Sequence, residues 1–572
     1  MVSRRKLAVS IGIVAVAAVS LLAASWASAS SKASYPRNKT LITSGTQWGP
    51  ISGMNPYAGS YATGMVGLVN ETLLRFDPLK DKYINWLAKS AKFSGKPGSV
   101  SKTFIIKVRP GIKWSNGKKF SAADVAFNIK LGRYTTAFWN VLYTNLKSVK
   151  AKGNTVTIKF KSTPNYAQWQ NLMWNLPMMN PAQYKGITQT TFTSFSPKVP
   201  IGTGPYTLGS IDPTIRVVWK KKPVWWAAKQ KVAPSPVPSF IIDLCNTNNT
   251  NALGGLLTAI EDLNNNYIVG INQYVANGKM QTYFPGKPYD LAANTAWLTP
   301  NTTHKPLNDK VFRKALATSI NVGNIINNDY HNLVTKADAT GLLKIWKKWI
   351  NSSQVSSLGF SFNTAKAKTL LSGAGYKTGS DGYVVNKDGS KIELSIAVPS
   401  GWSDWETAET MIVNSAKAAG IHITIKVGDF NAYQAARNNG TFDLVIDNTY
   451  QMSDNPYTFF NGLFHMPVLT AQTFANFSRY ENAGAWVLTK KLDKTPLGAT
   501  AKRKAIMNSL QKVTLTELPN IPLWYNGVWA QTQSKYWKNW PSSKSTRKYV
   551  PAMWRGYLQM TGIDMYTHVK KA

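Results

Sequence analysis

A strand, a helix and a second strand between residues 392 and 428 constrain the fold more than any other feature of this 572-residue chain. Apolar residues alternate along two short stretches, and each pattern predicts a strand: Ile392, Leu394, Ile396 and Val398, then Ile421, Ile423, Ile425 and Val427. Between them, Ser403 and Glu406 have the spacing of a capping box that opens a helix, and Gly420 ends that helix. This order predicts a βαβ unit with parallel strands, and therefore an α/β fold.

The loops that leave this predicted sheet carry the candidate ligand-binding residues. A further strand is predicted over residues 442–446, after the Asn439-Gly440 turn. Ligands of open α/β sheets bind at the carboxyl ends of the strands. The three loops at those ends, 399–403, 428–431 and 447–455, carry Trp402, Phe430, Tyr450 and Asp454. Core packing explains any single aromatic residue equally well, but their convergence on one sheet edge indicates a binding site.

Two shorter patterns lie in the first third of the chain. Val156, Ile158 and Phe160 alternate after a Gly153-Asn154 turn, which predicts the second strand of a hairpin. Ser121 and Asp124 form a variant of the capping box and predict the start of a helix.

The first residues have the composition of an export signal. Arg4, Arg5 and Lys6 precede an apolar run over residues 7–24, and Ala27-Ser28-Ala29 offers a cleavage site, so residues 1–29 are expected to be a signal peptide. The Sec and twin-arginine routes both remain open, as does an uncleaved anchor. The one cysteine, Cys245, lies far from the cleavage point, so neither an internal disulfide nor a lipoprotein anchor is expected.

The charge balance is strongly basic, with 67 Lys and Arg residues against 26 Asp and Glu residues and a formal net charge of +41. The basic residues are scattered as single and paired lysines, so nucleic acid is not expected as a partner. Two explanations stay open. Few carboxylates leave little to protonate in an acidic exterior, and a basic protein is attracted to an anionic cell wall.

No motif for metal, cofactor or catalysis stands out. The five histidines have no metal-ligand spacing, and the sequence contains no phosphate-binding glycine loop and no nucleophile elbow. Neither a cofactor, nor a metal, nor enzyme activity is expected. The alternative is a penicillin-interactive serine acyl-enzyme, whose three short motifs occur as Ser99-Val-Ser-Lys102, Lys377-Thr378-Gly379 and Ser453-Asp454-Asn455. Their order differs from that of such enzymes, and Ser99 lies in a Gly/Ser-rich loop.

A set of motifs then carries a resemblance to a known family. The most specific pieces are Glu71-Thr-Leu-Leu, Trp86-Leu-Ala-Lys-Ser and the stretch from Phe104-Ile-Ile-Lys-Val-Arg-Pro-Gly to Ala-Ala-Asp-Val125. Further pieces are Gly202-Thr-Gly-Pro-Tyr206, Val224-Trp-Trp226, Phe312-Arg-Lys-Ala-Leu316, the stretch from Ala365 to Tyr376, Gly440-Thr-Phe-Asp-Leu444 and Pro519-Asn-Ile-Pro-Leu523. In this order they resemble the family 5 extracellular solute-binding proteins, the peptide- and nickel-binding components of ABC importers.

The resemblance implies a periplasmic-binding-protein-like type II fold, with two lobes that close on ligand and a smaller inserted domain. Lobe I would comprise 35–75, 186–291 and 525–572, the inserted domain 76–185, and lobe II 292–524. It also implies an exported, periplasmic or extracellular monomer that captures a di- or oligopeptide and passes it to the membrane permease of an ABC transporter. A sugar or a metal chelate remains open as the ligand, because this frame serves many solutes.

The resemblance also bears on the candidate ligand-binding residues. Phe430 keeps the family spacing to Asp443 and resembles an aromatic residue that lines a side-chain pocket. Tyr450 and Asp454 occupy a loop one residue shorter than in peptide-binding members, in which Asp454 either binds the ammonium of a peptide or caps the turn before Pro456. Tyr61 completes the set of candidate ligand-binding residues.

Overall fold

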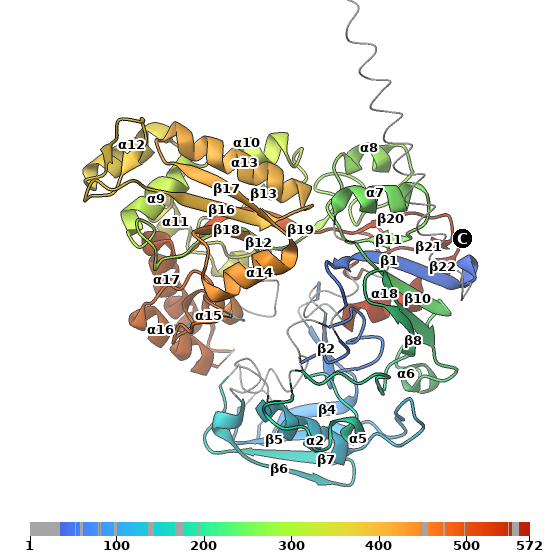
Figure 1. Ribbon diagram of the computed structural model, residues 1–572. Coiled ribbons are helices and arrows are strands. Elements are labelled where there is room, and N and C mark those ends of the chain that lie inside the picture. The colour runs from blue at the N-terminus through green and yellow to red at the C-terminus, as the bar shows by residue number, and fades with distance from the viewer. Residues whose placement is uncertain are drawn as a thin grey trace, which may run out of the picture.

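The structure is a computed structural model, and it describes residues 35–572 except 52, 58–60, 78, 81, 97–99, 135–141, 166–175, 193, 247, 449–455, 473–474, 497, 547 and 552–559. The predicted signal peptide therefore lies outside the described residues. Two six-stranded sheets and one four-stranded sheet, with the helices packed on them, organise the rest of the chain (Figure 1). We call them the first sheet, the second sheet and the small sheet.

The first sheet has six strands in the order β20-β11-β1-β10-β9-β8. β1 pairs in parallel with β10 and β11, and the remaining pairs are antiparallel. Its strands are β1 (Thr40–Gln47), β8 (Tyr206–Asp212), β9 (Arg216–Lys221), β10 (Phe240–Cys245), β11 (Leu263–Asn264) and β20 (Gln531–Thr532). Its helices are η1 (Arg37–Lys39), α6 (Trp226–Lys229), α7 (Asn249–Leu257), α8 (Ile271–Ala276) and α18 (Gly562–His568).

The second sheet also has six strands, in the order β13-β19-β12-β18-β16-β17. They are β12 (Leu291–Pro300), β13 (Thr335–Lys336), β16 (Leu394–Pro399), β17 (Ile423–Gly428), β18 (Leu444–Asp447) and β19 (Ile521–Val528). Its helices are α9 (Lys310–Ser319), α10 (Val322–Asn328), α11 (Ser352–Leu358), α12 (Thr364–Gly373), α13 (Ser403–Ala418), α14 (Phe430–Asn439), α15 (Tyr457–Phe464), α16 (Ala483–Lys494) and α17 (Thr500–Glu517), with η4 (Lys344–Trp349).

The βαβ unit predicted from the sequence is confirmed. β16 pairs with β17 in parallel register from Leu394 opposite Ile423 to Pro399 opposite Gly428, with α13 between them in the chain. Alternate residues pack on opposite faces of this sheet: Ile396 belongs to the core under α13, and Ala397 packs with Tyr433 of α14. Both faces of the sheet are therefore covered by helices.

The predicted capping box at Ser403 is wrong. The helix α13 begins at Ser403 itself with Trp402 as its N-cap, and no side chain caps the first turn. Glu406 instead accepts a hydrogen bond from the backbone N–H of Gly401, at 2.9 Å. Trp402 thus lies at the cap, three residues after the end of β16, at the edge of the sheet.

The small sheet is antiparallel, in the order β4-β5-β7-β6, and forms the lower end of the molecule in Figure 1. It consists of β4 (Ala88–Phe93), β5 (Thr103–Val108), β6 (Leu146–Lys152) and β7 (Thr155–Phe160), with α2 (Ala122–Leu131), η2 (Gly132–Tyr134) and α5 (Pro181–Tyr184) nearby. The predicted hairpin through Gly153-Asn154 and the capping box at Ser121 and Asp124 are both confirmed. Three two-stranded pairs complete the fold: β2 (Leu74–Asp77) with β3 (Lys82–Asn85), β14 (Lys377–Thr378) with β15 (Val384–Val385), and β21 (Trp537–Lys538) with β22 (Lys570–Lys571).

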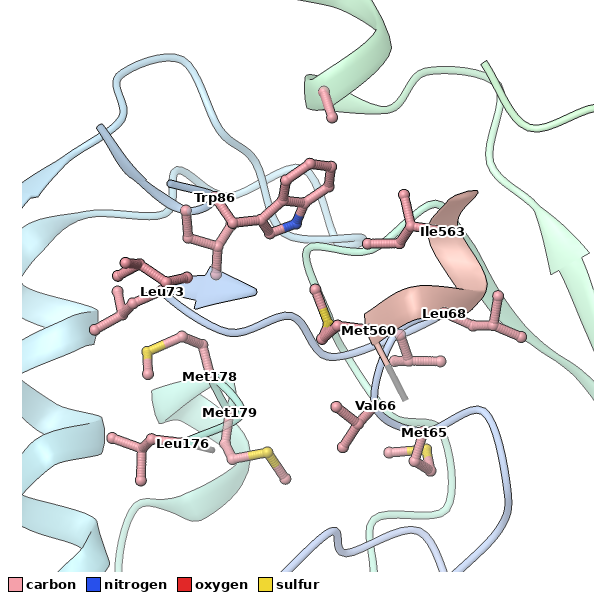
Figure 2. Packing of buried hydrophobic residues seen from close by; sticks show 14 of the residues in the cluster. Met65, Val66, Leu68, Leu73, Trp86, Leu176, Met178, Met179, Met560 and Ile563 are labelled. Carbon is pink, nitrogen blue, oxygen red and sulfur yellow. The ribbon is translucent and has the colours of Figure 1, made fainter. Parts of the chain in front are cut away.

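One hydrophobic core joins the first sheet to the small sheet. Figure 2 shows Met178 beside Leu73 and Met179 between Leu176 and Val66, while Met560 from the C-terminal part of the chain approaches Val66 and Leu68. Segments that are hundreds of residues apart thus share one buried cluster.

A buried carboxylate lies inside this core. Glu71 is fully buried and accepts hydrogen bonds from the indole N–H groups of Trp86 (2.8 Å), Trp226 (2.8 Å) and Trp225 (3.3 Å). Burial raises the pKa of Glu71, while the indole donors favour its charged form and partly offset that shift. The structure therefore brings three separate sequence motifs, around Glu71, Trp86 and Trp225-Trp226, into one hydrogen-bonded cluster.

The buried carboxyls predict how stability depends on pH. Burial raises the pKa of Asp243, Asp262 and Asp404 to about 6 and that of Glu261 to about 8. A carboxyl whose pKa is raised in the folded state contributes stability below its unfolded pKa, and the contribution is lost as the pH rises through the folded value. We therefore expect a higher melting temperature at pH 4–5 than at pH 8, measured by calorimetry.

Glu261 provides the matched variant. Its carboxylate accepts hydrogen bonds from Ser44 (2.7 Å) and Asn264 (2.8 Å). Burial also raises the pKa of Asp329 and Glu409 to about 8, so Glu261→Gln should reduce the loss of stability between about pH 6 and pH 8 by its own share. An acid-unfolding midpoint well above pH 4 would contradict this account.

Candidate functional site

A cavity of about 340 Å³ lies between the first and second sheets, within the size range of small-molecule sites. Its lining residues come from both sheets and from the strands that connect them. They are Thr46, Trp48, Asn249, Tyr267, Asn294, Trp402, Asp404, Trp405, Phe430, Tyr433, Gln434, Arg437, Asp447, Asn448, Asn526 and Trp529.

Aromatic rings form the wall on the side of the second sheet. Trp402 follows β16 and Phe430 follows β17, and their rings stack with centroids 5.8 Å apart. Trp402 also packs edge-on against Trp405 at 4.8 Å, and Phe430 stacks on Tyr433 at 6.5 Å. The carboxyl ends of two parallel strands thus place their loops, and the rings they carry, at one edge of the sheet.

The opposite wall comes from the first sheet and touches the aromatic wall. Trp48, directly after β1, lies with its ring centroid 4.8 Å from that of Trp402. The side-chain amide of Asn249 donates to Ser403 Oγ and to Asp404 Oδ1, both at 3.1 Å, and the backbone N–H of Asn249 donates to Gly401 at 3.2 Å. These contacts join the two walls, so the structure has the cleft closed on this side.

The floor of the cavity is built from the two strands that connect the sheets. Asn294 lies on β12, Asn526 lies on β19, and Trp529 follows β19. The side-chain oxygens of Asn294 and Asn526 are buried and accept no hydrogen bond from the part of the chain that is described. A buried unpaired acceptor is unfavourable, so a ligand N–H or O–H group would favour a small movement of either amide toward it.

The charged side chains that line the cavity have partners in the protein. Arg437 of α14 contacts Asp447, the last residue of β18, at 3.3 Å, and its guanidinium stacks 4.1 Å from the ring centroid of Phe477. The hydroxyl of Tyr330 donates to Asp404 Oδ2 at 3.1 Å, and burial raises the pKa of Asp404 to about 6. The cavity therefore offers aromatic faces, amide groups and two carboxyls to a ligand.

The structure places some of the predicted ligand-binding residues at the cavity and others elsewhere. Trp402 and Phe430 line the cavity, as the sheet-edge prediction places them. Tyr450 and Asp454 lie outside the described residues, but the strand that leads to them ends in Asp447, which lines the cavity. Tyr61 is half-buried against the core that joins the first sheet to the small sheet, and it is not among the lining residues of the cavity.

Several lining residues were missed by the sequence interpretation: Trp48, Asn249, Tyr267, Asn294, Arg437 and Asn526. The predicted site came from the continuous stretch 392–455, whereas the other wall and the floor of the cavity come from distant segments of the chain. The position of Trp48 in the sequence could have indicated its role, because it follows a strand of the first sheet just as Trp402 follows a strand of the second.

The three motifs of the serine-enzyme alternative are only partly described. Ser99 and the Ser453-Asp454-Asn455 motif lie outside the described residues, and Lys377-Thr378 forms the short strand β14. Within the described ranges, no group of three or more His, Cys, Asp or Glu side chains could hold a metal ion.

Two α/β sheets with a cavity between them are typical of solute-binding proteins with a periplasmic-binding-protein-like fold. Residues 82–468 match the family described as bacterial extracellular solute-binding proteins, family 5 Middle. The chain belongs to this family, and the predicted resemblance and fold class are confirmed.

Three similar proteins illustrate the family. A mannohexaose-bound periplasmic oligopeptide-binding protein of Thermotoga maritima superposes with a TM-score of 0.88 and 30% identity, over 94% of this chain and 99% of that chain. The oligopeptide-binding protein AppA of Bacillus subtilis is 23% identical over 68% of this chain and 69% of its own length. The nickel-binding periplasmic protein of Escherichia coli is 24% identical over 69% of this chain and 72% of its own length.

Membership has general consequences. Proteins of this family are periplasmic or extracellular solute-binding proteins rather than enzymes, and they work with the membrane components of ABC transporters. No helix among the described residues is both long enough and apolar enough to cross a bilayer.

The contacts between the walls predict a shift in closure. Asn249→Ala removes two side-chain hydrogen bonds across the cleft, so it should weaken the closed form by about 2 kcal/mol, roughly 30-fold in the closed-to-open ratio. Small-angle scattering of the ligand-free protein should then give a larger radius of gyration. Asn251→Ala, on the same helix, is the matched control. An unchanged radius for Asn249→Ala would contradict the assignment of these contacts to closure.

Proposed function

We propose that this protein captures di- or oligopeptides outside the cytoplasm and delivers them to the permease of an ABC importer. The observation that carries the proposal is the cavity between the two sheets, whose aromatic wall and amide floor face the same space. Family membership and the relatives named as oligopeptide-binding proteins support it. The protein would act as an exported monomer without a lipid anchor, and we propose no catalytic step for it.

Peptide chemistry fits the described walls. The rings of Trp402, Phe430 and Trp48 offer apolar surface for peptide side chains. After a small movement of their amides, the unsatisfied oxygens of Asn294 and Asn526 would accept hydrogen bonds from peptide N–H groups. The main-chain groups of any peptide would be recognised in this way, while the rings would select among side chains.

Closure would follow from the division of the chain. We propose lobe I as 35–75, 186–291 and 525–572, the inserted domain as 76–185, and lobe II as 292–524. The first sheet lies with lobe I and the small sheet with the inserted domain, while β12 and β19 run through the proposed boundaries. Rotation about the ends of these two strands would open and close the cavity.

The loop after β18 would supply the charged anchor. Closing the lobes removes water from the ammonium of a peptide, and an unpaired buried charge is very unfavourable. We propose Asp454 as its partner, with Tyr450, Phe430 and Trp402 as further ligand contacts. The loop that carries Asp454 begins after Asp447, the last residue of β18, and Asp447 lines the cavity.

Asp454→Asn tests this assignment. The substitution should weaken binding of a free peptide by roughly 2–5 kcal/mol and leave stability nearly unchanged. Calorimetric titration should also show that the N-acetylated form of the same peptide binds the wild type poorly. Asp381→Asn, at an exposed turn, is the matched control. Equal affinity of wild type for free and acetylated peptide would leave Asp454 as a turn residue only.

An oligosaccharide is the second candidate ligand. The Thermotoga maritima protein holds mannohexaose, and indole faces with amide groups also suit sugar rings and hydroxyls. Titration with mannohexaose under the same conditions separates the two candidates. Peptide capture predicts no heat with the sugar, whereas tight sugar binding together with no binding of any peptide would transfer the proposal to oligosaccharides.

A further inference from the structure

The small sheet has one face that is covered and one face that is open. Its inward residues, Phe104, Ile106, Val156 and Ile158, are buried, and α2 packs against β6 and β7. We infer that the open face is a docking surface for a bilayer that contains anionic lipids. This interaction is separate from ligand capture in the cavity.

The strand register decides which side chains share the open face. Lys92, Ile105, Thr157 and Lys150 form one row across the four strands, because each lies opposite the next. Ser90, Lys107, Thr155 and Lys152 form the next row, and Lys159 lies opposite Thr103 and Ser148. Five lysines and several hydroxyl side chains therefore occupy one surface, which is roughly 15 Å wide from the spacing of four strands.

These lysines are exposed and unneutralised. All five, Lys92, Lys107, Lys150, Lys152 and Lys159, are exposed, and none forms an ion pair with any described residue. The four strands contain no Asp or Glu. The open face is consequently a plane of positive charge.

The surrounding segment has the same bias. Residues 82–185 contain 18 Lys and Arg residues and a single acidic residue, Asp124, so this segment carries +17 of the formal +41. Asp124 is occupied in the capping box at the start of α2, where it accepts from the backbone N–H of Ser121 at 2.9 Å. Much of the net charge thus lies in the segment that contains the small sheet.

The chemistry of the face favours a bilayer over a phosphodiester polymer. Recognition of individual phosphates commonly uses arginine, whose planar fork binds two oxygens, in a groove that follows the backbone. Here all five cations on the open face are lysines, which suits a diffuse plane of negative charge. Ile105 is the one large apolar residue in these rows and is half-buried, so the association is electrostatic and does not require insertion.

Such docking would hold the protein close to the membrane in which a permease lies. The effect would fall with salt, because the Debye length is about 8 Å at physiological ionic strength. It would not require ligand, since none of the five lysines lines the cavity.

The test uses the exported form predicted from the sequence, residues 30–572, and measures co-sedimentation with two kinds of vesicle. One contains phosphatidylcholine and phosphatidylglycerol, and the other contains phosphatidylcholine alone. The protein should bind only the anionic vesicles, and high salt should release it. Changing the five lysines to Gln should reduce partitioning by about 100-fold or more, given the contribution of each lysine near an anionic surface.

The matched control changes five exposed lysines of α16 and α17 to Gln: Lys491, Lys494, Lys502, Lys504 and Lys512. It loses the same charge and should keep nearly all of the binding. Lys150→Gln with Lys152→Gln, on the edge strand β6, provides a milder variant with an intermediate loss, should the five-fold change impair folding. Circular dichroism reports the fold of each.

Three results would overturn the inference. The first is no binding to anionic vesicles by a folded wild type. The second is an equal loss in the face variant and the control, which would assign binding to overall charge. The third is tighter binding to soluble poly(glycerol phosphate) than to vesicles of equal charge, which would assign the face to a wall polymer.

Discussion

The pairing of β12 with β19 is the interaction on which the rest of the structure depends. These strands are antiparallel from Leu291 opposite Val528 to Leu298 opposite Ile521, at the centre of the second sheet. Their outer ends lead directly to the first sheet, where Ala530 N–H donates to Asp290 and β20 pairs with β11. This two-stranded ribbon therefore connects the two sheets and carries Asn294 and Asn526 in the floor of the cavity.

Part of this arrangement could be predicted from the sequence because it is local. Alternating apolar residues define β16 and β17, and the loops that follow them place Trp402 and Phe430. The opposing wall could not be predicted in this way, because Asn249 meets Ser403 across 154 residues of chain. The start of α13 also differed from its motif, since Trp402 takes the cap and Glu406 bonds to Gly401 instead.

The family motifs were recognisable in the sequence, but their physical reason is visible only in the structure. Glu71, Trp86 and Trp226 are separated along the chain, yet the carboxylate and the indoles satisfy each other inside one core. The position of the basic residues on the surface is likewise visible only in the structure. The strand register places lysines from β4, β5, β6 and β7 on one open face, away from the cavity between the large sheets.

Two lobes joined by this ribbon should close on a ligand in the cavity. Spin labels at Lys220→Cys on β9 and Lys426→Cys on β17, in a Cys245→Ser background, report the distance between the lobes. A pair at Lys426→Cys and Lys502→Cys lies within lobe II and serves as the control. Added peptide should narrow the interlobe distribution toward one shorter distance and leave the control unchanged. Identical interlobe distributions with and without a peptide that calorimetry shows to bind would contradict the account.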